Sequence, residues 1–123
     1  MPLPTLIPAA LSALALSMGP AATPGCELTL TVQTEFGAPV SATVTCDPVS
    51  GTHPDPTMVC DVLSKADGDF LKIPRGEAMF CPANYAPVTV TAKGDWHGKP
   101  VEFTHTYPNQ CSANVSMGKI FSF

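Results

Sequence analysis

The stretch that decides the fold is Leu28-Thr29-Leu30-Thr31-Val32-Gln33, in which apolar and polar residues alternate. Successive side chains of a strand point to opposite faces of a sheet, so this period predicts a half-buried strand over 28–33. Gly37 and Pro39 bound it as turn residues, and a second alternating run occupies 40–46. The second run places Cys46 on the apolar face, so this cysteine is expected on the core side.

A helix is predicted after these strands. Asp55 is an N-cap candidate, Pro56 suits the first helical position, and Gly68 is a plausible stop. The resulting short helix, at about 56–66, turns Cys60 toward the sheet.

Further strands are predicted at 88–92 and 101–106, joined by a turn containing Gly94 and Gly98, and a last short strand at 120–123. This order of elements favours an antiparallel sheet with a helix packed on one face. The expected fold class is therefore α+β, as a two-layer sandwich.

The first 23 residues are expected to be a secretory signal peptide, which leaves 24–123 as a single domain. Its apolar stretch, Leu6 to Leu16, is followed by small residues and Pro20, although no Lys or Arg precedes Lys65 to supply the usual basic start. Four prolines weaken the alternative of a buried helix, and the stretch is too short for a convincing membrane span. The mature protein is expected to be secreted and extracellular.

Composition narrows the function classes. Ten acidic and six basic residues give a net charge of -4 without a basic cluster, which argues against nucleic-acid partners and anionic membrane surfaces. The five cysteines fit a small exported domain that needs covalent support.

Enzymatic signatures are missing from the sequence. His53, His97 and His105 do not have metal-ligand spacing, and no Cys-x-x-Cys or Gly-x-Ser-x-Gly motif accompanies them. The sequence therefore predicts no enzyme activity, no catalytic residue, no metal and no cofactor.

The most informative stretch is Phe80-Cys81-Pro82-Ala83-Asn84-Tyr85-Ala86-Pro87. Its two prolines fix their own φ angles and bias the preceding residues toward extended geometry, and a bonded Cys81 would pin the backbone. A protease cleft binds extended segments by strand addition, and a rigid one loses little entropy on binding. A proline-rich connector with a structural disulfide is the alternative interpretation, and this stretch alone does not overturn it.

Several stretches resemble those of a known family, the Streptomyces-type subtilisin inhibitors, and the resemblance covers nearly all of the chain after the leader. These are Gly51-Thr52-His53-Pro54-Asp55-Pro56 before Cys60, Arg75-Gly76-Glu77 before Cys81-Pro82, Tyr85-Ala86-Pro87-Val88, Trp96-His97-Gly98-Lys99, Asn109-Gln110-Cys111 and Ile120-Phe121-Ser122-Phe123.

The resemblance implies a five-stranded antiparallel sheet with two short helices, a homodimer formed sheet to sheet, and substrate-like inhibition of subtilisin-class serine proteases. It implies disulfides Cys46 with Cys60 and Cys81 with Cys111. It also places the scissile bond between Ala83 and Asn84.

The resemblance assigns further roles in a protease-binding loop made of Phe80, Cys81, Pro82, Ala83, Asn84 and Tyr85. Ala83 would fill the primary pocket of the enzyme, Phe80 and Pro82 would occupy upstream subsites, and Tyr85 would lie on the leaving side. Asn109 would support the loop from behind.

The small side chain of Ala83 argues against trypsin, whose pocket wants Lys or Arg, and favours subtilisin-like or elastase-like proteases. The alternative function is a secreted structural or adhesive domain that keeps the fold without a useful bait.

Cys26 is an odd cysteine with no counterpart in the resemblance. Three interpretations are open: lipid acylation with membrane anchoring, a disulfide between two copies, and a free or removed thiol.

Overall fold

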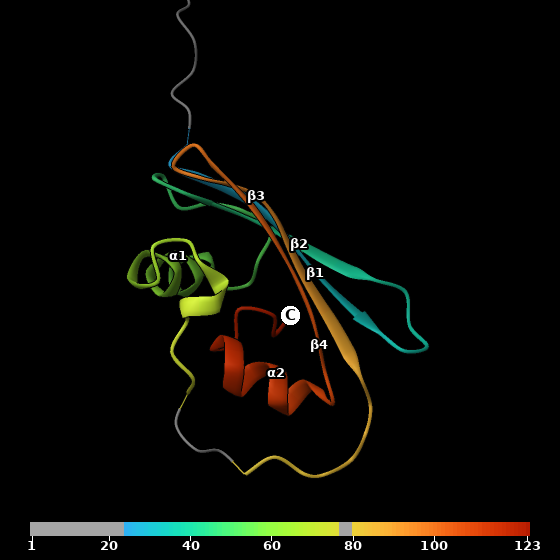
Figure 1. Cartoon of the computed structure of the whole chain (residues 1–123). Coiled ribbons are helices and arrows are strands. Elements are labelled where there is room, and N and C mark those ends of the chain that lie inside the picture. The colour runs from blue at the N-terminus through green and yellow to red at the C-terminus, as the bar shows by residue number, and fades with distance from the viewer. Residues whose placement is uncertain (1–23, 77–79) are drawn as a thin grey trace, which may run out of the picture.

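The computed structural model describes residues 24–76 and 80–123, so the predicted leader at 1–23 lies outside the described residues. The described chain forms a sheet with helices on one side (Figure 1). In chain order the elements are β1 (Cys26–Thr34), β2 (Val40–Cys46), α1 (Pro56–Lys65), the short 3-10 helix η2 (Phe70–Lys72), β3 (Val88–Trp96), β4 (Lys99–Tyr107) and α2 (Gln110–Met117).

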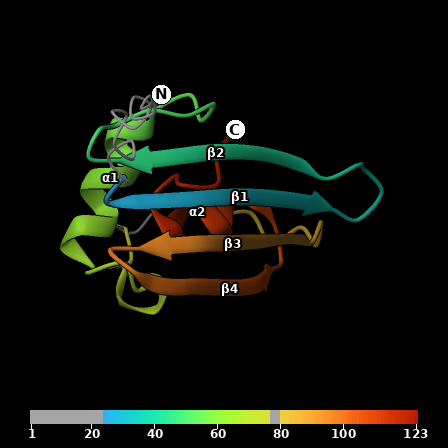
Figure 2. The ribbon, with the colours of Figure 1, turned by 90° about the horizontal axis from the view of Figure 1, so that it is seen from above.

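The sheet is antiparallel throughout and has the strand order β2-β1-β3-β4, which Figure 2 shows from above. Strand β1 lies in the centre, where Leu28 pairs with Val44 of β2 and with Gly94 of β3. The alternation of apolar and polar residues in β1 predicted a half-buried strand. The structure confirms it, because Leu28 and Leu30 are buried while Thr29 is exposed.

Both helices and the C-terminal residues lie on the same face of the sheet (Figure 1). The core between the two layers includes Leu30 and Val90 from the sheet, Leu63 from α1, and Phe121 from the chain end. The opposite sheet face is rich in threonine, and its hydroxyls bond across strands, as between Thr89 and Thr106 at 2.8 Å. Burial on one face only is the expected two-layer α+β arrangement.

The described residues form four strands, so the predicted fifth strand at 120–123 was wrong. Ile120 and Phe121 are both buried, whereas successive residues of a half-buried strand point to opposite faces. The Ile120 N–H instead donates to Met117 in a turn that folds the chain end onto the helical layer.

The turn prediction for Gly94 was also wrong, because Gly94 lies inside β3 with φ +150. A Cβ there would lie 2.0 Å from the backbone oxygen of Glu27, so glycine permits the close approach of β1. The hairpin turn uses His97 and Gly98, both with positive φ.

Helix α2 was not located from the residue pattern. Asn109 caps its start by accepting the Ser112 N–H at 2.9 Å, and Gly118 ends it with φ 62 in the left-handed region. Together with α1, this helix gives the two short helices that the family resemblance implied.

The structure contains the disulfide Cys46–Cys60, which ties β2 to α1. Cys26 is a free thiol in the core, with a fully buried side chain and its Sγ 3.1 Å from that of Cys46. A buried sulfur is poorly placed to carry an acyl chain or to bond a second copy, so the structure favours the free-thiol interpretation of Cys26.

The buried position of Cys26 predicts slow alkylation. Burial raises the pKa of the Cys26 thiol from 9.0 to about 11. The reactive thiolate is therefore about 100-fold rarer at neutral pH than for an exposed thiol. We expect iodoacetamide at pH 8 to label the folded protein at least ~100-fold more slowly than the urea-unfolded protein, with the rate rising as the pH approaches 11. Mass spectrometry of timed samples measures both rates, and fast labelling of the folded protein would contradict this burial.

Candidate functional site

The stretch 80–87 forms a surface loop that leads into β3. It has no regular secondary structure and runs below α2 in the view of Figure 1. The loop presents large apolar side chains to solvent, since Phe80 is 92% exposed and Tyr85 is 75% exposed. Ala83 and Asn84, between them, are exposed as well.

One end of the loop is fixed covalently. The disulfide Cys81–Cys111 joins it to the first turn of α2, with a Cα to Cα distance of 5.6 Å. This is the second pairing that the family resemblance implied. The disulfide therefore keeps Cys81 next to the start of α2.

The middle of the loop is held by the Asn109 side chain, which is only 6% exposed. Its Nδ2 donates to the carbonyl oxygens of Pro82 at 3.1 Å and Asn84 at 3.0 Å. Its Oδ1 accepts the Ser112 N–H that caps α2. A single side chain thus fastens the carbonyls on both sides of Ala83 to the start of a helix.

The exit of the loop is fixed by the backbone, because the Ala86 N–H donates to the Pro108 carbonyl at 2.8 Å. Val88 then pairs with Thr34 of β1 and begins β3. All of these braces except the last come from the segment 108–111. Bracing at several points reduces the entropy that the loop would lose on binding a partner.

The predicted site residues fall into two groups in the structure. The exposed group is Phe80, Pro82, Ala83, Asn84 and Tyr85. Cys81 and Asn109 lie on the side facing α2. The sequence interpretation missed the bond between Ala86 and Pro108. Backbone groups carry no residue-specific signal, so only the fold could show it.

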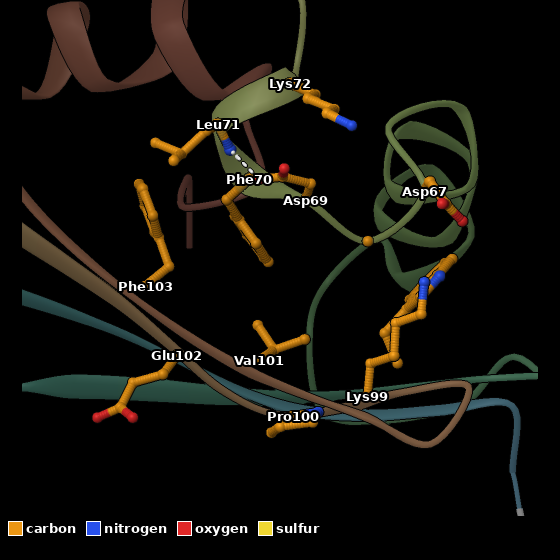
Figure 3. Close-up of a pocket in the computed structure, with 12 residues that line it drawn as sticks. Asp67, Asp69, Phe70, Leu71, Lys72, Lys99, Pro100, Val101, Glu102 and Phe103 are labelled. Carbon is orange, nitrogen blue, oxygen red and sulfur yellow. Dashed lines mark hydrogen bonds between the residues drawn. The ribbon is translucent and has the colours of Figure 1, made fainter.

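Away from the loop, a groove of about 350 Å³ lies between η2 and β4 (Figure 3). Phe70 of η2 and Phe103 of β4 stack in it with ring centroids 5.2 Å apart. Charged side chains such as Lys72 and Glu102 border it.

The three histidines differ in burial, because His97 and His105 are exposed and only His53 lies inside the protein. His53 is buried and contacts the Ile120 carbonyl through Nε2 at 2.8 Å, while Nδ1 accepts the Asp55 N–H. Within 24–76 and 80–123, no group of three or more His, Cys, Asp and Glu side chains is placed to hold a metal ion. Over the same residues, no helix is long and apolar enough to cross a membrane.

Comparisons with known proteins agree with this geometry. The protease inhibitor SIL-V2 of Streptomyces orinoci is 41% identical over 85 residues, which are 68% of this chain and 78% of that protein. The subtilisin inhibitor of Streptomyces albogriseolus is 38% identical over 84 residues, 68% of this chain and 58% of that protein.

A solved structure extends the likeness to three dimensions. Sermetstatin of Streptomyces caespitosus, crystallised in complex with subtilisin of Bacillus licheniformis, matches with a TM-score of 0.64 and 30% identity. The match covers 80% of this chain and 98% of sermetstatin. The family model described as subtilisin inhibitor-like matches residues 21–109, which include the whole braced loop and Asn109. The chain therefore belongs to the subtilisin inhibitor-like family.

Proposed function

We propose that this chain is a secreted inhibitor of subtilisin-class serine endopeptidases and that Ala83–Asn84 is its scissile bond. The observation that carries the proposal is the exposed loop 80–87, held rigid by the Cys81–Cys111 disulfide and Asn109. Membership in a family of protease inhibitors, rather than enzymes, supports it. So does the neighbour solved in complex with subtilisin.

The exposure of the loop suits substrate-like binding. A protease adds its substrate as an extended strand and reads alternate side chains in pockets. Ala83 would fill the primary pocket, with Pro82 in the next subsite upstream. Phe80 would reach a further apolar subsite, and Tyr85 would contact the leaving side. The two aromatic side chains are mostly exposed in the free protein and so are available to a partner.

The bracing explains why a substrate-like loop would inhibit. When a protease attacks the Ala83 carbonyl carbon, the bond to the Asn84 nitrogen breaks and the new amine must leave before water can complete hydrolysis. Asn109 holds Pro82 before this bond and Asn84 after it, so the two new ends stay close together. The amine is then placed to re-form the bond with the acyl-enzyme.

The methyl group of Ala83 selects the target class. Trypsin pockets carry a carboxylate that requires a basic side chain, whereas subtilisin-like and elastase-like pockets accept small apolar ones. A buried methyl contributes about 1 kcal/mol, so Phe80 and the main chain would supply much of the affinity.

Secretion and dimerisation complete the proposal. Two intramolecular disulfides fit an oxidising extracellular location. A second copy would pack sheet to sheet on the threonine-rich face, which neither α1 nor α2 covers (Figure 1). The alternative of a structural or adhesive domain without inhibitory activity is not favoured, because the loop keeps its braces and the named relatives are inhibitors.

Titration of subtilisin with the purified protein tests the function directly. We expect a stoichiometric loss of protease activity at one inhibitor loop per enzyme, because the rigid loop binds tightly and is released slowly. Residual activity after mixing, read with a chromogenic peptide, measures the stoichiometry. Progressive digestion of the protein without loss of protease activity would support the structural-domain alternative instead.

The substitution Ala83→Lys tests the assignment of the primary residue. A lysine at this position would pair with the pocket carboxylate of trypsin, so we expect trypsin inhibition to strengthen by at least ~100-fold. Inhibition constants for trypsin and subtilisin, measured on the parent protein and the variant, give the comparison. Ala86→Lys serves as the control at another exposed loop position. An unchanged trypsin constant in Ala83→Lys would refute the assignment.

The substitution Asn109→Asp separates the two tasks of this residue. Aspartate can still accept the Ser112 N–H as an N-cap, but it has no N–H to offer to Pro82 and Asn84. Two lost hydrogen bonds of about 1 kcal/mol each predict an inhibition constant for subtilisin weaker by on the order of 10- to 100-fold.

Urea unfolding provides the control for Asn109→Asp. We expect this variant to lose less stability than Asn109→Ala, in which the helix cap is lost as well. Full inhibition by Asn109→Asp would show that the loop does not depend on these bonds.

A further inference from the structure

The hairpin between β1 and β2 carries the most exposed large apolar side chain of the described residues. Phe36 is 95% exposed, which is more than any other exposed large hydrophobic residue among those that the structure describes. A phenylalanine in this position contributes little to the fold of its own chain. Phenylalanine, like tyrosine and tryptophan, is enriched in protein–protein interfaces relative to the rest of the surface.

This hairpin is held in a fixed shape. The Gln33 side-chain Nε2 donates to the Thr34 carbonyl at 3.0 Å and to the Gly37 carbonyl at 2.7 Å. A Cβ at Gly37 would lie 2.4 Å from Thr34 Oγ1, so the turn closes tightly there. Phe36 is therefore presented by a braced turn, as Phe80 and Tyr85 are presented by a braced loop.

The hairpin lies beside the exit of that loop. Thr34, at the end of β1, pairs with Val88, where the loop becomes β3. Figure 2 shows the β1–β2 connection extending beyond the sheet at the same end as the start of β3.

Between the hairpin and the loop is a groove of about 610 Å³. Its hairpin wall includes Phe36, and its loop wall includes Tyr85 and Pro87. Glu35 is the one charged residue among those that line it. The groove thus suits an apolar segment with few charges.

We propose that Phe36 and the hairpin 34–37 form a second contact surface for the inhibited protease, on the leaving-group side of the Ala83–Asn84 bond. The proposal rests on the function proposed above. One wall of the groove belongs to the loop that enters the active-site cleft, so a protease seated on Tyr85 lies next to the groove and to Phe36. The occupant of the groove is an apolar surface segment of the protease, from the rim of its active-site cleft.

This placement favours the protease over a second copy of the chain. A sheet-to-sheet partner would cover the threonine-rich face, whereas the groove opens beside the loop itself. The rim of the cleft differs among proteases that share a pocket preference. The hairpin would therefore select among enzymes that accept Ala83 equally well.

The test compares Phe36→Ala with Leu71→Ala in the full chain. Leu71 is a matched control, because it is 82% exposed on η2 and lines the other groove (Figure 3), away from the loop. We expect Phe36→Ala to weaken subtilisin inhibition by about 10-fold, mainly through faster dissociation, and Leu71→Ala to change it by less than about 2-fold. Stopped-flow association and dissociation rates measure the effect, and equal urea midpoints exclude a folding defect.

The outcomes separate this inference from the proposed function. If the parent protein does not inhibit subtilisin, the proposed function itself fails. If the parent inhibits and Phe36→Ala inhibits equally well, the hairpin contact is refuted while the loop assignment stands. A change in molecular mass on sedimentation, with unchanged inhibition, would identify a second copy as the occupant and would also overturn the inference.

Discussion

The structure of the functional end of this protein depends on one buried amide. Asn109 uses its oxygen to cap α2 and its nitrogen to bond the carbonyls of Pro82 and Asn84. The position of the loop is thereby linked to the start of a helix, and the Cys81–Cys111 disulfide adds a second link two residues further along the chain. The amide supplies two N–H donors and a separate acceptor oxygen. An ionised carboxylate has no donor and a hydroxyl has only one, so neither could bond both carbonyls and cap the helix as well.

The remainder of the fold holds this amide in place. Asn109 follows the end of β4 after a single residue, Pro108, so the pairing of β4 with β3 and of β3 with the central β1 fixes where α2 begins. The apolar face of the sheet packs against α1, α2 and the chain end, which leaves the loop at one end of the sandwich (Figure 1). The β1–β2 hairpin lies beside this end, so Phe36 and the exposed Tyr85 of the loop line the same groove.

The sequence predicted a strand or a helix correctly where apolar residues alternate regularly or where a capping residue marks a helix start. The alternation in β1 and the Asp55-Pro56 start of α1 both appear in the structure as expected. Helix α2 was missed because its buried residues, Ala113, Val115 and Met117, recur at every second position and imitate a strand. The brace from Asn109 joins residues 25 and 27 positions apart in sequence, so only the family resemblance anticipated it.

The central claim is that the loop keeps the two ends of a cut Ala83–Asn84 bond together, and resynthesis of that bond tests it most directly. Intact protein and protein cut at this bond are each incubated with a trace of subtilisin, and the ratio of the two forms is followed by mass spectrometry. The account predicts that both samples reach the same ratio with a substantial intact fraction, whereas a Cys81→Ser, Cys111→Ser variant is digested. Cut protein that never regains the bond would contradict the account.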